Sequence, residues 1–198
     1  MSPALRLPAL TWAWRSLFTV AFFALLWCAF VVSDQWRFQH AQGEVLDAAL
    51  TARNDAAPLS IAAVAKGGVI GRVNIARLGI SVVIVEGISS AILRHAAGHI
   101  VGTALPGQPG NSAISAHRDT FFRPLRNIRQ DDIIAVATPQ GDYRYRVVSI
   151  RIVPPEDVSV LEPSVNQVLT LVTCYPFYFV GAAADRFIVR AERIEDAS

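Results

Sequence analysis

An uninterrupted apolar run near the N-terminus constrains this chain more than any other feature. Residues 16–33 read SLFTVAFFALLWCAFVVS and contain no charged side chain. As an α-helix this run would extend about 27 Å, close to the hydrocarbon thickness of a bilayer. Tryptophans lie near both of its ends, where indole rings prefer the membrane–water interface. The run therefore predicts a membrane-spanning helix.

The charges on either side of this run predict its orientation. Arg6 and Arg15 precede it without any acidic residue, whereas acidic residues follow it from Asp34 onward. Because positive charge next to a spanning helix favours the cytoplasmic side, residues 1–15 are expected inside the cell and the rest of the chain outside. We therefore expect a single-pass signal anchor whose helix contacts membrane lipid.

Three other interpretations of the apolar run are weaker. A cleaved signal peptide has a shorter apolar region and a small-residue cleavage site, and no A-x-A pattern follows Val32. Lipoprotein processing at Cys28 would need a small residue where Trp27 stands. A buried core helix of a soluble protein is the third alternative.

The remaining composition is that of an ordinary folded domain. Hydrophobic residues make up 53% of the 198 residues, and the apolar run accounts for much of that excess. The net charge is only +2, and the arginines are interleaved with acidic residues, so no nucleic-acid partner is expected. With two cysteines, the chain is not a disulfide-stapled miniprotein.

Two further regions follow the predicted anchor. Residues 34–67 are expected to form a juxtamembrane helix and a stalk, because partial helical spacing gives way to TARNDAAP and then Gly67-Gly68. Residues 68–195 alternate short Val- and Ile-rich runs with turn residues, which is typical of a β-barrel or sandwich. Seven runs are expected as strands: 68–75, 80–87, 110–117, 132–138, 143–153, 168–174 and 186–193. Short helices are expected at 89–95 and 121–127.

Cys174 and His117 are the side chains best suited to chemistry. Cys174 ends the apolar run VLTLVTC and is followed by Tyr175-Pro176, which would place a thiol at the rim of a sheet. His117 ends the small-residue strand GNSAISAH, where a strand end could present an acid or base. A buried, inert cysteine is the alternative for the first.

The other motifs argue against several enzyme classes. His95 and His99 are four residues apart, but no Glu or Cys completes a ligand set, so hydrogen-bonded or solvated histidines are expected and no metal. The chain contains no G-x-S-x-G, no P-loop and no HExxH, which removes the usual support for serine hydrolases, nucleotidases and zincins. No cofactor is expected.

Two separated motifs resemble those of sortases. TLVTC at 170–174, followed twelve residues later by Arg186, is similar to the sortase active-site signature, and residues 98–125 resemble the histidine segment of that family. The sequence around Cys174 is most similar to that of the class D branch of the family. The resemblance covers about residues 68–195 and implies a mainly β fold, a closed eight-stranded β-barrel with short helices behind an N-terminal transmembrane helix.

The resemblance also implies a mechanism and partners. The family's nucleophile falls on Cys174, its histidine on His117 and its arginine on Arg186, with Arg190 on the same strand face as the alternative. Such an enzyme would be a cysteine transpeptidase on the outer side of a bacterial cytoplasmic membrane. It would cleave secreted proteins at a C-terminal LPxTG-like sorting signal and join them to an amine of the cell wall or a pilin.

The substrate groove is a less specific expectation. The side chains expected to line it, besides Arg190, are Ala116, Val172, Thr173, Phe177 and Phe179. The aromatic residues among them could instead cover one end of the barrel. Two functions of other kinds stay open: an L,D-transpeptidase-like cell-wall enzyme, and a membrane-tethered β-domain that binds surface proteins without catalysis.

Overall fold

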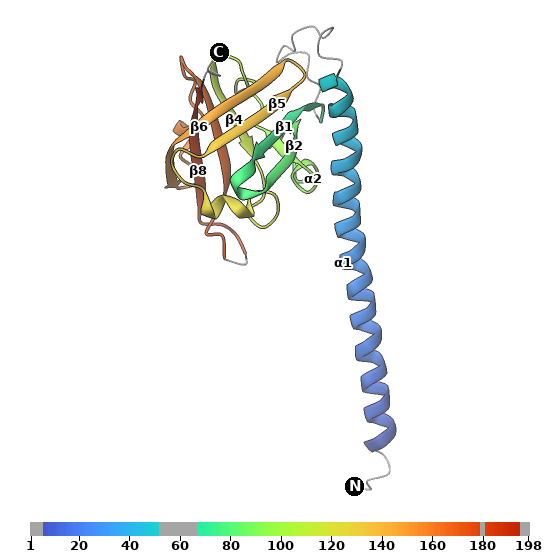
Figure 1. The fold of residues 1–198 in the computed structure, drawn as a ribbon. Coiled ribbons are helices and arrows are strands. Elements are labelled where there is room, and N and C mark those ends of the chain that lie inside the picture. Colours follow the sequence, from blue (N-terminus) through green and yellow to red (C-terminus); the bar gives the residue numbers. More distant parts are fainter. Residues whose placement is uncertain (1–5, 52–66, 179–180, 195–198) are drawn as a thin grey trace. The chain divides into compact units, whose positions relative to one another are not determined.

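One long helix, α1, occupies Arg6–Thr51 and contains the whole predicted membrane segment (Figure 1). The structure, a computed structural model, describes residues 6–51, 67–178 and 181–194. Within α1, Thr11–Ala48 are long and apolar enough to cross a membrane, and an 18-residue window in this stretch has a mean hydropathy of 2.2. Its large apolar side chains are exposed to the surroundings, as in a helix whose solvent is lipid.

The chain divides into two compact units after Phe38. The end of α1 belongs to the second unit, where Leu46 is buried and the Gln39 side-chain oxygen accepts a hydrogen bond from the Val83 amide at 3.2 Å. The helix ends at Thr51, where the TARNDAAP segment begins. Most of the predicted stalk, residues 52–66, lies outside the described residues, so the division at 34–67 stays a prediction.

Eight strands of the second unit close into a barrel in the order β1-β2-β3-β4-β7-β8-β6-β5 (Figure 1). The strands are β1 (Val69–Ile75), β2 (Ile80–Glu86), β3 (Ala97–His99), β4 (Gly110–Ser115), β5 (Ile133–Thr138), β6 (Gly141–Val153), β7 (Gln167–Tyr175) and β8 (Asp185–Ile194). The predicted closed eight-stranded barrel is confirmed. Seven strands match the predicted runs, whereas β3 was not predicted from periodicity because it has only three residues.

Short helices connect the strands. The predicted helices are present as α2 (Ser90–Leu93) and the 3₁₀ turn η5 (Arg123–Asn127), each shorter than expected. The Ser89 hydroxyl caps α2 by accepting a hydrogen bond from the Ile92 amide. Two further 3₁₀ turns were not predicted: η4 (Ala76–Leu78) between β1 and β2, and η6 (Val158–Leu161) between β6 and β7.

Alternation along the strands fills the barrel interior with apolar side chains. On β8, for example, Phe187, Val189 and Ala191 belong to the core, as the period-two pattern predicts. Tyr145 of β6 is 1% exposed, and its hydroxyl accepts a hydrogen bond from the Gly107 amide at 2.8 Å. Burial raises the pKa of this phenol because the anion would lose its hydration.

The pairing of β4, β7 and β8 gathers three strand ends at one edge of the barrel. β4 and β7 are parallel, with Ser115 opposite Val172, so both strands end at the same edge. β8 is antiparallel to β7 and therefore begins where β7 ends. This edge holds the candidate site.

A buried histidine ties β2, β3 and β4 together. His99 is 0% exposed; its Nδ1 lies 2.7 Å from Glu86 Oε2 and its Nε2 lies 2.9 Å from the Ala104 carbonyl oxygen. Because a carbonyl only accepts, Nε2 carries the hydrogen of its bond to Ala104, while Nδ1 is paired with the Glu86 carboxyl group. The Thr103 hydroxyl, 3.0 Å from Nε2, accepts a hydrogen bond from the Ala113 amide of β4. His99 thus has protein partners on both ring nitrogens, as a hydrogen-bonded histidine was expected to have.

We expect His99→Leu to destabilise the barrel by about 3–5 kcal/mol, because the change leaves the Glu86 carboxyl buried without its partner. Thermal unfolding of the full chain in detergent, followed by near-UV circular dichroism, measures the loss. The double variant Glu86→Leu with His99→Leu should recover part of it. A single variant as stable as the parent protein would show that the pair adds nothing to the barrel.

An ion pair joins η4 to the start of β5. The Arg77 guanidinium donates to both carboxylate oxygens of Asp132, and the Arg129 amide donates to Asp132 Oδ2 at 2.8 Å. The hydrogen bond from Arg77 is the main cause that holds the pKa of Asp132 below its usual range. The stabilisation is therefore present above the pKa of the unfolded carboxyl, about 3.9, and is lost as the pH falls through the lower folded value.

We expect Asp132→Asn to lower the thermal midpoint at pH 7 by a small amount and to have no effect in strong acid, where Asp132 is protonated in the parent protein too. Midpoints of both proteins measured from pH 7 down to pH 2 test this. A gap between the two curves that stays constant over this range would contradict the ion-pair account.

Candidate active site

Cys174 lies on the outer face of β7, one residue before the strand ends. Its neighbours in sequence, Thr173 and Tyr175, are on the inner side of the same strand, since strand side chains alternate. The Cys174 side chain is partly exposed, and both cysteines of the chain are free thiols. The thiol is therefore reachable from outside the barrel wall.

Two hydrogen bonds continue the β4–β7 pairing toward His117 and Cys174. Beyond the last strand pair, the Ala116 amide donates to the Val172 carbonyl at 3.3 Å, and the Thr173 hydroxyl donates to the Ala116 carbonyl at 2.8 Å. The last pair of the ladder is Ser115 opposite Val172, and the same register extended by two residues would put His117 opposite Cys174. Both side chains are half-buried.

The β7–β8 register separates the two candidate arginines. Arg186 is the direct cross-strand partner of Cys174, whereas Arg190 is the partner of Thr170. Both arginines lie on the outer face, but four residues of strand put Arg190 about 13 Å further along. Arg186 is half-buried, and its Nη1 donates to the Asp185 carbonyl at 3.0 Å. The register therefore favours Arg186 as the arginine beside the thiol.

A small apolar cluster and a pocket lie on the same outer face, away from the barrel core. Val153, Val160 and Ile188 are buried together, with Val172 packed against them, so η6 covers this part of the sheet. Next to the cluster is a pocket of about 230 Å³ whose lining includes Thr170, Ile188 and Arg190. An extended segment placed along β7 from Cys174 would pass these side chains.

The other residues expected to line the groove differ in how much surface they offer to a substrate. Ala116 and Thr173 are only 3% and 2% exposed, so in this structure they position the strand ends and offer little surface. Val172 is half-buried on the outer face. Phe177 packs edge-on against Phe187, with ring centroids 5.1 Å apart, and so covers one end of the barrel core.

Phe179, the remaining residue of that set, lies outside the described residues. Its expected contact with substrate therefore stays a prediction.

Arg118 has a role that sequence reasoning missed. Its Nη1 donates to the Pro176 carbonyl at 3.0 Å, and its Nη2 donates to the Gly181 carbonyl at 2.8 Å. The residue after the histidine thus holds the loop after the cysteine. The only sequence signal was an arginine next to His117, which by itself does not indicate a partner 58 residues away.

Comparisons with known proteins show the family to which this barrel belongs. The model of the sortase domain family matches residues 73–194. Sortase D of Bacillus subtilis is 31% identical over 125 residues, which are 63% of this chain and 63% of that protein. The matched part thus spans less than two thirds of that relative.

Solved structures give the same result. A Clostridium perfringens Sortase D5 transpeptidase shares 30% identity and a TM-score of 0.61, over 67% of this chain and 82% of that one. Sortase A from Corynebacterium diphtheriae shares 31% identity and a TM-score of 0.62, over 67% and 64%. The family model matches most of the β-barrel, and the solved sortases share its fold. The chain therefore belongs to the sortase family. The predicted resemblance, including the similarity to class D members, is confirmed.

Proposed function

We propose that this protein is a membrane-anchored cysteine transpeptidase. The observation that carries the proposal is that three strand ends meet at one edge of the barrel: the end of β4, which His117 follows, the end of β7 with Cys174 and the start of β8 with Arg186. Membership in the sortase family supports the same assignment. The exposed apolar side chains of α1 support anchoring in a membrane. Family membership supports the cytoplasmic membrane of a bacterium, and the charges that flank the apolar run support an orientation with the barrel outside.

The first half of the reaction follows from the thiol and the imidazole. The Cys174 thiolate attacks the Thr carbonyl carbon of an LPxT-like sorting signal and forms a tetrahedral intermediate. The C–N bond then breaks, and His117 as imidazolium gives its proton to the departing amine. The products are a thioester on Cys174 and the released C-terminal fragment.

The second half reverses these proton transfers. An amine of the cell wall or of a pilin attacks the thioester carbonyl, and neutral His117 takes the proton from the attacking nitrogen. When the C–S bond breaks, Cys174 leaves as thiolate and a new amide bond joins the two partners. The chemistry is acyl transfer between amines, so it balances without a cofactor.

Arg186 is suited to charge stabilisation rather than proton transfer. A guanidinium stays protonated at any physiological pH, so it cannot act as a base. From the cross-strand position beside Cys174, it can donate hydrogen bonds to the oxyanion that develops in both tetrahedral intermediates.

The test uses the full chain in lipid nanodiscs with peptides of the LPxTG type and an amine such as triglycine. Mass spectrometry should detect a peptide joined to the amine, and without amine it should detect the acyl group on the peptide that contains Cys174. If sorting peptides give neither product while a stem peptide of peptidoglycan is cross-linked, the cell-wall L,D-transpeptidase alternative holds. If the chain binds such peptides without cleaving any, it is a binding module.

A further inference from the structure

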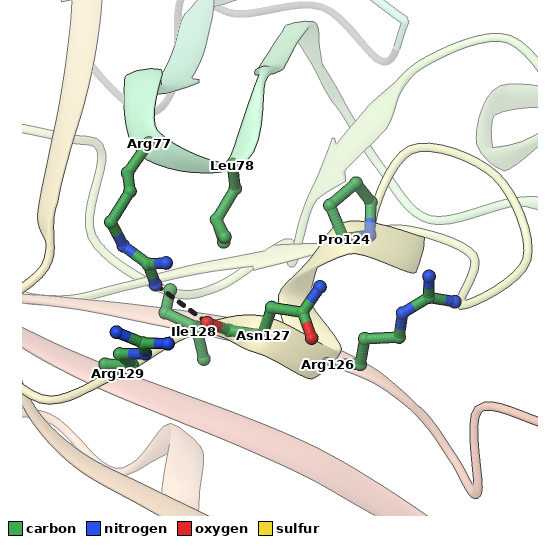
Figure 2. A pocket seen from close by; sticks show the side chains of 7 residues that line it. All are labelled: Arg77, Leu78, Pro124, Arg126, Asn127, Ile128 and Arg129. Carbon is green, nitrogen blue, oxygen red and sulfur yellow. Dashed lines mark hydrogen bonds between the residues drawn. The ribbon is translucent and has the colours of Figure 1, made fainter.

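A positively charged pocket lies outside the proposed active site, between the β1–β2 turn and the segment that follows His117. Its volume is about 550 Å³. Figure 2 shows the lining side chains, which come from η4 and from η5 with the residues just after it. They are Arg77, Leu78, Pro124, Arg126, Asn127, Ile128 and Arg129.

One arginine of this pocket is held in place. Arg77 Nη2 donates to the Asn127 carbonyl at 2.7 Å (Figure 2), and the same guanidinium binds both oxygens of Asp132. Asp132 is ionised at neutral pH, since Arg77 holds its pKa below the usual range. Arg77 is therefore oriented before any ligand arrives, which lowers the entropy that binding would cost.

The other two arginines leave the pocket with positive charge. In the described part of the chain, neither the Arg126 nor the Arg129 guanidinium is paired with a carboxylate. Arg126 instead lies over the ring of Tyr178, 5.4 Å from its centroid. The pocket is thus lined by three arginines, one of which is paired with the Asp132 carboxylate, and this leaves an excess of about two positive charges.

We propose that this pocket binds a phosphate or pyrophosphate group of a small phosphorylated compound. Guanidinium forks match the oxygens of such groups with paired, charge-assisted hydrogen bonds. The volume exceeds what one phosphate needs, and Leu78 and Pro124 offer apolar surface for the organic part of the ligand (Figure 2).

The pocket is linked to the loop that follows Cys174. Arg126 contacts Tyr178, four residues after the thiol, so a ligand that engages Arg126 competes with this cation–π contact. The proposal itself concerns binding and does not depend on transpeptidase activity.

The experiment is isothermal titration calorimetry at constant ionic strength, with the full chain in neutral lipid nanodiscs. The probes are inorganic phosphate, pyrophosphate, glucose 1-phosphate as a sugar phosphate and glycerol 3-phosphate as a lipid headgroup, with acetate for comparison. We expect saturable binding of pyrophosphate and of at least one phosphate ester, and no saturation by acetate.

The matched variants are Arg126→Gln and Arg129→Gln inside the pocket and Arg123→Gln outside it, on the exposed side of η5. Each pocket variant should weaken pyrophosphate binding about tenfold or more, because a charged hydrogen-bond donor is lost, whereas Arg123→Gln should change it less than about twofold. Equal effects of all three variants, or no saturation by any phosphate compound, would overturn the proposal. Because all three positions are exposed, the variants should fold, and circular dichroism checks that they do.

Discussion

Replacing Cys174 with alanine should abolish both the acyl-enzyme and the ligated product. Without the sulfur, the proposed site loses the thiolate that attacks the carbonyl carbon, and His117 has no intermediate to protonate. We expect the rate of peptide ligation to fall by at least about 10⁴-fold, to the uncatalysed background. The measurement is product formation by mass spectrometry over hours, with the full chain in nanodiscs.

The chain offers a matched control in its second cysteine. Cys28 is a free thiol on the apolar helix α1, so Cys28→Ala should leave the ligation rate unchanged. Cys174 is partly exposed, and its loss should hardly affect the thermal midpoint. Ligation that persists in Cys174→Ala would refute the assignment of the nucleophile and with it the proposed mechanism.

Replacing Arg186 with alanine should slow ligation by about 10²–10³-fold, through kcat, because the oxyanion loses its charged donor in the transition state. Arg190→Ala should reduce the rate far less, and mainly through KM, since Arg190 lies opposite Thr170 beside the outer pocket. Steady-state kinetics of the two variants with one sorting peptide measures the difference.

The two arginine variants also test the register itself. Both side chains lie on the same outer face of β8 and are half-buried. The two variants therefore remove the same side chain from positions of similar exposure. If Arg190→Ala loses kcat as strongly as Arg186→Ala, the oxyanion is not bound where the β7–β8 pairing puts the Cys174 partner. Arg186→Lys should recover little of the loss, because an ammonium group lacks the planar fork of donors.

Local patterns in the sequence predicted much of the fold. The apolar run at 16–33 predicted a helix that the structure contains, and period-two alternation predicted seven strands and the two faces of β8. These features depend on the side chains within one segment, so they can be read without knowing any neighbour. The eighth strand rested on the family resemblance, because Ala97–His99 is too short to show a period.

Local sequence patterns could not predict which distant segments of the chain lie side by side. The sequence showed His99 only as one of two histidines four residues apart, and the structure buries it on β3, where Glu86 and Thr103 supply its partners. Arg118 gave no sign that it binds two carbonyls of the loop after Cys174. Each of these contacts depends on which strands lie side by side, and many pairings satisfy the same alternation.

The sequence by itself determined that an apolar helix precedes a β-domain and that Cys174, His117 and an arginine of the last strand are its candidates for chemistry. Only the tertiary structure decided that Arg186, and not Arg190, is the cross-strand partner of Cys174, and that the ends of β4 and β7 share one edge. The physical reason is that alternation along a strand specifies the face on which a side chain lies. Which residue of the neighbouring strand lies opposite it is set by the hydrogen-bond register. In this barrel, the parallel β4–β7 ladder and the antiparallel β7–β8 ladder bring those three residues to one edge.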